Sequence, residues 1–194
     1  MRTATIERNT SETRIKLELN LDGSGLQQID TGIGFFDHML TQIARHGQID
    51  LTIAARGDLE VDSHHTVEDV GIVLGQAIKR ALGDKCGITR YGDSYVPMDE
   101  ALALVVIDLS GRTYLQYRAE LGKGHLNHFD IEMVEEFFRA VSVQGEMNLH
   151  IHLVDGVNSH HCIEAIFKAF GRALASAVKI DERIKGVPST KGIL

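Results

Sequence analysis

The stretch that decides the fold is VDSHHTVED at residues 61–69, because the chain repeats its pattern as VNSHHCIEA at residues 157–165. Each copy has two adjacent histidines and a glutamate three residues after the second histidine. Each copy also opens a long run in which apolar residues recur every three or four positions, as on one face of a helix. A polar triplet repeated at the start of two such runs indicates an internal duplication.

The segments around the two copies follow the same order of elements. In the first half, apolar periodicity predicts a strand over 13–21, a helix from 36 to 47, a strand over 49–55, and a helix between Ser63, the expected N-cap, and Gly83, the expected C-cap. In the second half, the expected elements are a strand within 101–111, a helix over 130–141, a strand over 147–154 and a helix over 159–178.

This order predicts an α+β fold, an α/β sandwich of two similar halves related by a pseudo-twofold axis. Each half is expected to be a small mixed sheet covered by helices. Residues 1–194 then form a single domain made of two repeats, at about 12–83 and 100–178. A linker over 84–99 and a C-terminal tail over 179–194 complete the expected organisation.

Composition limits the classes of function. A chain of 194 residues with 43% hydrophobic content can bury a sizeable core and is expected to be soluble. Its net charge of −7 disfavours binding to nucleic acid or to an anionic membrane, so a small molecule is the expected partner. No apolar run is long enough to span a membrane, no signal peptide is evident, and the two cysteines are expected to be reduced; we therefore expect a cytoplasmic protein.

The repeated triplet is suited to binding a cation. The first histidine and the glutamate are four residues apart on a helix, and the second histidine and the glutamate are three apart, so the three side chains can converge. Aligning the halves places His38 on Glu136, and both face away from the apolar stripe of their own helix. The predicted metal ligands are therefore His38, His64, His65, Glu68, Glu136, His160, His161 and Glu164. This set suits Mn, Fe, Zn, Co or Ni, and ligand type alone does not choose among them.

A simpler interpretation exists for each part of this set. A single His-His-x-x-Glu pattern is more often a solvated helix start, where an acidic side chain is stabilised by the helix dipole. The conservation of the triplet between two copies whose flanks differ favours metal binding. Glu136 taken alone reads as an exposed helix acid, and Asp69 as support for the helix dipole.

Basic and hydroxyl side chains outside the repeats suggest a phosphate site. Arg90, Arg112 and Lys168 are spread along the second part of the chain, and the tail presents Ser189, Thr190 and Lys191 beside glycines. Such groups can hold a phosphate if the fold brings them together. The alternative is that they are ordinary surface charge.

These motifs together closely resemble one enzyme family. RNTSET, GFFDHML, DSHHTVEDVGIVLGQA, GITRYG, PMDEALA, DLSGR, NSHHCIEAIFKAFGRAL and PSTKG are similar, from end to end of the chain, to imidazoleglycerol-phosphate dehydratase, an enzyme of histidine biosynthesis. The resemblance implies two four-stranded sheets, two Mn²⁺ ions per active site, and a homo-oligomer of 24 subunits with active sites at subunit interfaces. A fused phosphatase domain is not expected.

Carried over to matching positions, the resemblance implies the same metal ligands, except that some members have histidine where this chain has Glu136. An anionic ligand would replace a neutral one there. The substrate-binding residues expected from the resemblance and from the metal set are Glu12, His38, His46, His64, His65, Glu68, Arg90, Arg112, Lys168, Ser189, Thr190 and Lys191. Five of these, Arg90, Arg112, Lys168, Ser189 and Lys191, are expected around the phosphate.

The implied reaction is the elimination of water from imidazole glycerol phosphate to give imidazole acetol phosphate. The hydrogen that is lost is not next to a carbonyl, so two cations on the ring nitrogens are expected to favour an imidazolate, which expels the hydroxyl through a diazafulvene-like intermediate. Glu12 is the first candidate to transfer protons and Asp99 the second, with Glu68 and Glu164 as further catalytic candidates. Glu12 and Asp99 could instead be solvated acids at strand ends.

Two other classes of function use the same ligands. A metal-dependent hydrolase of a phosphorylated small molecule would activate water instead of eliminating it. A non-catalytic metal-storage shell would need neither Glu12 nor the PSTKG tail.

Overall fold

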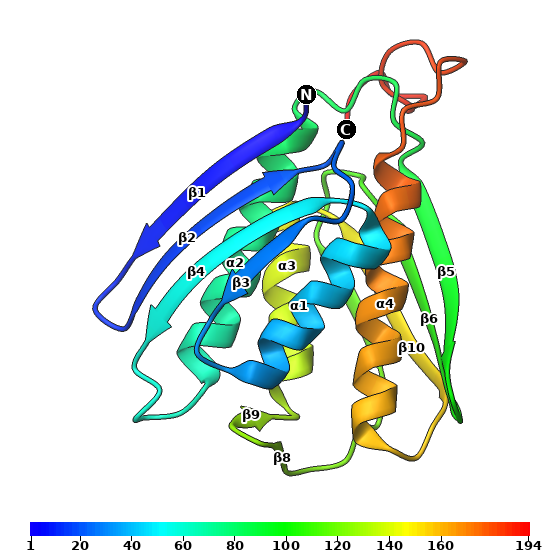
Figure 1. The fold of residues 1–194 in the computed structure, drawn as a ribbon. Helices are drawn as coiled ribbons and strands as arrows, with labels where there is room; N and C mark the ends of the chain where they lie inside the picture. The colour runs from blue at the N-terminus through cyan, green and yellow to red at the C-terminus, as the bar shows by residue number, and fades with distance from the viewer.

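The computed structural model describes all of residues 1–194, which form two four-stranded sheets with four helices between them (Figure 1). The first sheet has the order β1-β2-β4-β3, with strands Thr3–Asn9, Thr13–Asn20, Asp50–Gly57 and Gln27–Asp30 in that order. The second has the order β5-β6-β10-β7, with strands Tyr91–Met98, Ala101–Asp108, Asn148–Asp155 and Tyr114–Arg118. The helices are α1 (Gly34–Gly47), α2 (His64–Leu82), α3 (Met133–Gly145) and α4 (Ser159–Val178).

The strand register confirms the duplication. In the first sheet, Leu51 of β4 pairs antiparallel with Leu19 and parallel with Gln27. In the second sheet, Leu149 of β10 pairs antiparallel with Ile107 and parallel with Leu115. Each half is therefore the same mixed sheet, and the expected α+β sandwich with two similar halves is confirmed.

Six strands were not expected from the sequence, four of them in the two large sheets. β1 and β3 in the first half, and β5 and β7 in the second, complete the two sheets, and β5 lies within the segment 84–99 that was expected to be a linker. A short hairpin of β8 (His125–Leu126) and β9 (Phe129–Asp130) precedes α3, which begins three residues later and ends four residues later than expected. In contrast, the observed bounds of α4 are those predicted.

The helix ends are only partly as expected. Gly83 follows α2, as predicted. Ser63 makes no side-chain cap, so the prediction of its capping role is wrong; Asp62 Oδ1 instead accepts the N–H of His64 at 2.7 Å. At the start of α4, Asn158 Oδ1 accepts the N–H groups of His160 and His161. In both motifs, a side-chain oxygen of a preceding Asp or Asn therefore satisfies N–H groups at the helix start.

The core lies between the sheets, where the helices of one half pack against those of the other. α1 packs against α4, and α2 against α3. Phe138 is fully buried, with its ring centroid 4.9 Å from that of Phe167 and 5.2 Å from that of Phe170. Such aromatic packing contributes more than the burial of its area alone. The two halves thus share one hydrophobic core.

All four helices begin at the same end of the molecule, and both chain termini lie at the opposite end (Figure 1). The end at which α2 and α4 begin therefore carries both His-His-x-x-Glu motifs. No helix of the structure has the length and apolar character needed to cross a membrane.

Candidate active site

Three of the predicted metal ligands meet at the helix-start end of the molecule. His38 of α1 and His160 and Glu164 of α4 bring their ligand atoms within 4.8 Å of one another. The Nε2 atoms of His38 and His160 lie 3.3 and 3.1 Å from Glu164 Oε2. Two imidazole nitrogens and a carboxylate oxygen are a donor set that binds a divalent transition metal. This group is called the α1/α4 cluster below.

The charge of Glu164 favours a cation. Burial by itself would raise the pKa of this carboxyl, but the ammonium of Lys168 and the imidazole of His38 hold the pKa below its ordinary value. Lys168 Nζ lies 2.7 Å from Glu164 Oε1, one helical turn further along α4. Glu164 is therefore ionised at neutral pH and can serve as an anionic ligand.

The equivalent group in the other half is less compact. His64 and Glu68 of α2 approach each other at 3.6 Å, between Nε2 and Oε2. Glu136 of α3, the counterpart of His38, lines a cavity of about 690 Å³ together with His64. However, Glu136 Oε2 lies 3.6 Å from Arg139 Nε, so its carboxylate already has a cationic neighbour.

The second histidine of each motif faces away from these groups, toward carboxylates. His65 Nδ1 lies 3.0 Å from Asp58, and His161 Nδ1 lies 2.8 Å from Glu100. These hydrogen bonds raise the pKa of both imidazoles. A carboxylate that accepts the Nδ1 proton fixes the ring and leaves Nε2 as the ligand atom, a common arrangement around metal-binding histidines.

The two candidate proton carriers lie beside the Nε2 atoms of these histidines. Glu12 Oε2 is 3.9 Å from His65 Nε2, and Asp99 Oδ2 is 3.7 Å from His161 Nε2. Both acids lie in the hairpin turns that precede β2 and β6. Asp99 has a positive φ of 50°, and its side chain is 73% exposed.

The tail and two arginines form a second group at the opposite end of the molecule. A cavity of about 360 Å³ is lined by Arg90, Arg112, Ser189, Thr190 and Lys191, among others. Asp108 holds the Arg90 guanidinium in two hydrogen bonds of 2.7 and 3.2 Å, and Arg90 also donates to the carbonyl of Pro188 at 2.9 Å. This cationic pocket has the chemistry to hold a phosphate.

Lys168 is the one residue of the five predicted around the phosphate that lies outside that pocket, and His46, another predicted substrate residue, is outside it as well. Lys168 lies beside Glu164, and the half-buried His46 lies near it at the end of α1. Burial lowers the pKa of His46, and the positive charges of Lys168 and Arg172 lower it further. These two side chains therefore line the face of α1 and α4 between the α1/α4 cluster and the tail.

The α1/α4 cluster and the tail pocket are separated by the length of α4. This helix has 20 residues, so it is about 30 Å long. His160 is at its start, whereas the backbone N–H of Arg90 donates to the carbonyl of Ala177 at its end, at 2.9 Å. Figure 1 shows these two ends of α4 far apart. One chain thus holds the two groups too far apart for a single small molecule to reach both.

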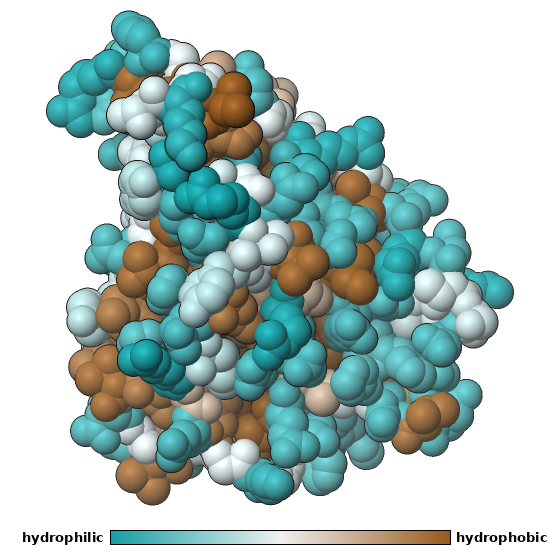
Figure 2. Space-filling view, turned by 180° about the vertical axis from the view of Figure 1, so that it is seen from behind, coloured by the Kyte–Doolittle hydropathy of each residue, from teal (hydrophilic) through white to brown (hydrophobic).

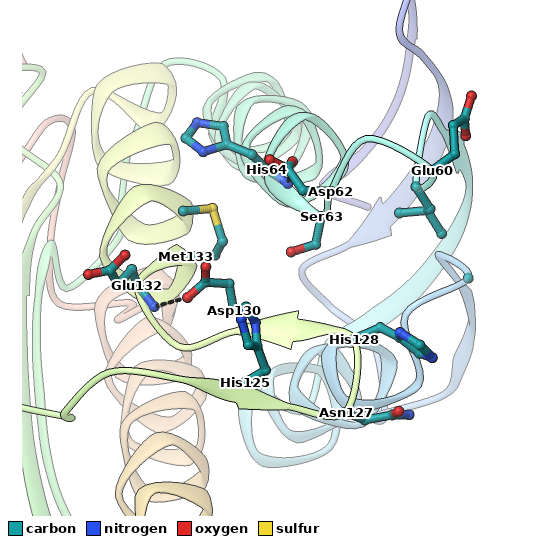
Figure 3. Close-up of a pocket in the computed structure, with 12 residues that line it drawn as sticks. Glu60, Asp62, Ser63, His64, His125, Asn127, His128, Asp130, Glu132 and Met133 are labelled. Atoms are coloured by element: carbon teal, nitrogen blue, oxygen red, sulfur yellow. Dashed lines mark hydrogen bonds between the residues drawn. The ribbon is translucent and has the colours of Figure 1, made fainter.

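A further cavity was not predicted from the sequence. It has a volume of about 840 Å³ and lies between the loop before α2 and the β8–β9 hairpin. In Figure 3, Asp62 and His64 lie on one side of it, and His125 and Asp130 on the other. The stretch HLNHFD has no clear periodicity, so its two histidines gave no signal that they would face His64.

Comparisons with known proteins point to one family. A family model described as imidazoleglycerol-phosphate dehydratase matches residues 31–174. A relative of that name from Streptococcus mutans is 60% identical over 194 residues, covering all of both chains. Another from Heliobacterium modesticaldum is 61% identical over 195 residues, again covering all of both chains.

Comparison with solved structures shows that the similarity extends to the fold. The crystal structure of imidazoleglycerol-phosphate dehydratase from Staphylococcus aureus matches with a TM-score of 0.84 and 44% identity, over 92% of this chain and 99% of that one. The enzyme from Pyrococcus furiosus matches with a TM-score of 0.84 and 36% identity, over 97% and 100% of the two chains. Sequence and fold agree over nearly the whole length, and the chain belongs to the imidazoleglycerol-phosphate dehydratase family.

Proposed function

We propose that this hydro-lyase removes water from imidazole glycerol phosphate in a metal-dependent reaction that gives imidazole acetol phosphate. The observation that carries the metal dependence is the α1/α4 cluster, in which His38, His160 and Glu164 converge from two halves of the chain. The family carries the identity of the substrate. Histidine biosynthesis is the pathway to which this family belongs.

The predicted ligand set fits two Mn²⁺ ions per active site. It offers only imidazole nitrogens and carboxylate oxygens, the donors that this metal accepts. The ligands would be His38, His64, His65, Glu68, Glu136, His160, His161 and Glu164. Bound divalent cations would act as Lewis acids toward the substrate's imidazole ring and lower its pKa. Asp58 and Glu100 support this role, because they orient His65 and His161 with Nε2 free.

Carboxylate side chains of this protein transfer the protons. A C–H bond and the C–O bond of the neighbouring hydroxyl break, a double bond forms between the two carbons, and the hydrogen and the hydroxyl leave as water. The resulting enol gives the ketone of the product when a proton leaves its oxygen and another adds to carbon. We assign the proton transfer at carbon to a carboxylate oxygen of Glu12 and name Asp99 as the second candidate. Glu68 and Glu164 assist as charged ligands. Glu12 is suited to proton transfer because its carboxylate is exposed and is not held by a short contact. Its nearest ion-pair partner is His65, with Nε2 3.9 Å from Oε2.

The tail pocket would hold the phosphate. Arg90, with two of its N–H groups fixed by Asp108, keeps others free for phosphate oxygens. Arg112, Ser189, Thr190 and Lys191 line the same pocket and would supply further donors. Lys168 and His46 lie elsewhere in one chain, so we assign them to the substrate site of an assembled particle.

The separation of the two groups along α4 favours active sites shared between copies. A substrate whose ring and phosphate are joined by a glycerol chain cannot extend from the α1/α4 cluster to the tail pocket of the same chain. The outer face of β6 offers a surface for contact, with the half-buried Leu102, Leu104 and Val106. Figure 2 shows apolar residues gathered on the side of the second sheet. We propose an assembly of 24 subunits with active sites at their interfaces.

The experiment that tests this function is a turnover assay of the Mn²⁺-loaded protein with imidazole glycerol phosphate. Products are identified by mass spectrometry, and a metal-stripped sample is the control. Loss of one water molecule only in the loaded sample supports the dehydratase. Release of inorganic phosphate would support a hydrolase, and bound metal without turnover would support a storage shell.

Removal of the metal also tests the assembly. Metal ligands contributed by separate subunits would be lost together, so chelation should convert the large particle to smaller species. Light scattering after size-exclusion chromatography measures the change, and Mn²⁺ added back should restore the particle. A particle that stays intact after complete metal removal contradicts ligands shared between subunits.

A further inference from the structure

We propose that Asp69 is a positioning residue for Glu12, acting through the hydroxyl of Thr13. The inference rests on the proposed role of Glu12 in proton transfer. Asp69 lies one helical turn after His65, so both side chains leave α2 on the face that meets the start of β2. Thr13 is the first residue of β2, and Glu12 immediately precedes it.

The contact between Asp69 and the sheet is buried and charged. Thr13 Oγ1 donates to Asp69 Oδ2 at 2.5 Å, and an Arg8 guanidinium nitrogen lies 2.9 Å from Asp69 Oδ1. Asp69 is 6% exposed and Thr13 is 2% exposed. A buried carboxylate with two specific partners is costly to disturb, so it fixes the distance between α2 and the start of β2.

The hydroxyl of Thr13 is also part of the turn that carries Glu12. Thr10 Oγ1 accepts the backbone N–H groups of Glu12 and Thr13 at 3.1 and 2.9 Å, and it lies 3.2 Å from Thr13 Oγ1. The carbonyl of Glu12 accepts the N–H of Asp58 at 3.1 Å. The backbone of Glu12 is thus held from both sides, and Asp69 ties this turn to the helix that carries His65.

The second half has no counterpart of the hydrogen bond between Thr13 and Asp69. Ala101 and Ala165 occupy the positions of Thr13 and Asp69, and both are buried. There the counterpart of Glu12 is Glu100, whose carboxylate is held directly, since Glu100 Oε1 accepts the N–H of Asn158 at 2.7 Å. The buried polar contact occurs only in the half where the acid's own carboxylate has no hydrogen bond to hold it. That difference favours a role in placing Glu12 over a general role in the fold.

The test replaces the hydroxyl without changing the shape of the side chain. Thr13→Val should lower kcat by about tenfold to a hundredfold, because a small displacement of a catalytic group has an effect of that size. KM for imidazole glycerol phosphate and the Mn²⁺ content per subunit should be unchanged. Thr13→Ser, which keeps the hydroxyl, should restore most of kcat. A residue with only a structural role would not produce this split between kcat and KM.

A second variant and two controls make the result decisive. Asp69→Ala introduces the residue type found in the second half and should show the same loss of kcat; it carries the test if Thr13→Val does not fold. Asp22→Asn breaks the ion pair of Asp22 with Arg2, at 2.7 Å, beside the ends of β1 and β2 that lie away from Glu12, and should keep the kcat of the unmodified protein. Glu12→Gln is the reference variant.

The outcomes separate the two hypotheses. If Glu12→Gln keeps full turnover, the proposed role of Glu12 fails. If Glu12→Gln is inactive but a folded Thr13→Val or Asp69→Ala variant turns over at the normal rate, the positioning role of Asp69 is overturned. Loss of kcat together with loss of bound Mn²⁺ would also overturn it, because the effect would then come from the neighbouring metal ligands.

Discussion

The two halves of the chain place equivalent histidines against different acids. In the first half, Asp58 holds His65 Nδ1, and the carboxylate of Glu12 stays free of short contacts. In the second half, Gly156 occupies the position of Asp58 and has no side chain to offer, and Glu100 holds His161 instead. The two equivalent glutamates therefore have different surroundings: Glu100 holds a histidine, and Glu12 does not.

The hydrogen bonds of Glu100 indicate a structural role for this residue. Hydrogen bonds from His161 and from the backbone N–H of Asn158 lower the pKa of Glu100 to about 2. A carboxylate with so low a pKa is a weak base and does not readily accept a proton at neutral pH. The comparison therefore favours Glu12 over its counterpart as the proton carrier.

The outer faces of the two sheets also differ. β2 presents Arg14, Lys16 and Glu18 to solvent, whereas the corresponding face of β6 presents Leu102, Leu104 and Val106. A polar face is suited to water, and an apolar face to burial against another protein surface. The second sheet is thus the better candidate for contacts between copies.

The largest expected effect is on turnover, when the two equivalent glutamates are exchanged for glutamine. Glu12→Gln should reduce kcat by roughly 10²- to 10⁴-fold, the usual contribution of a general acid or base, with no change in melting temperature. Glu100→Gln should lower the melting temperature, because it weakens the hold on His161 and on the start of α4. Steady-state kinetics measures kcat, and thermal unfolding measures the melting temperature. Similar effects of both substitutions would remove the distinction between the halves.

The next effect concerns a feature that both halves retain. Gly75 of α2 and Gly171 of α4 lie where helices cross, and a Cβ at either position would come within 2.8 Å of a backbone carbonyl oxygen, that of Val141 or of Ile43. Alanine normally favours a helix over glycine by about 1 kcal/mol. Here Gly75→Ala and Gly171→Ala should each lower the free energy of unfolding by about 1–3 kcal/mol, because the helices must separate.

Chemical denaturation measures the change for each glycine variant, and Gly34→Ala is the matched control. Gly34 is in α1, and a Cβ there would have nothing within 4 Å. It should be neutral or stabilising. A strong effect at only one of the two crossings would show that the helix pairs are not equivalent.

The smallest effect concerns the arginines that precede the first strand of each sheet. Arg2 pairs with Asp22, and Arg90 pairs with Asp108. The hydrogen bond from Arg2 lowers the pKa of Asp22, so its stabilisation is present above the ordinary value of 3.8 and is lost as pH falls through the lowered value. Asp22→Asn should lower the free energy of unfolding by less than about 1 kcal/mol at pH 7, because the pair is partly exposed.

Unfolding of both proteins from pH 7 down to acid measures this difference. The gap between Asp22→Asn and the unmodified chain should close as pH falls below the ordinary pKa of an aspartate. A gap that is constant with pH would show that the carboxylate's charge is not what stabilises this corner. Turnover should not change, in contrast to substitutions at Arg90, which lines the tail pocket.

Much of the fold was predictable because it depends on local periodicity. The bounds of α4 and the matching registers of β4 and β10 follow from apolar spacing. β5 was missed because Gly92, Asp93 and Pro97 give it the composition of a loop. Only packing explains it: a Cβ at Gly92 would come within 2.0 Å of the carbonyl oxygen of Ala173 in α4. Pro97 is tolerated because β5 is at the edge of its sheet.

By itself, the sequence determined the duplication and the set of candidate metal ligands, because helical spacing and donor chemistry are local properties. Only the tertiary structure decided which side chains meet. His38 joins His160 and Glu164 because α1 of one half packs against α4 of the other. It also decided that the α1/α4 cluster and the tail pocket lie at opposite ends of α4, because a helix is rigid and its length is set by its number of residues.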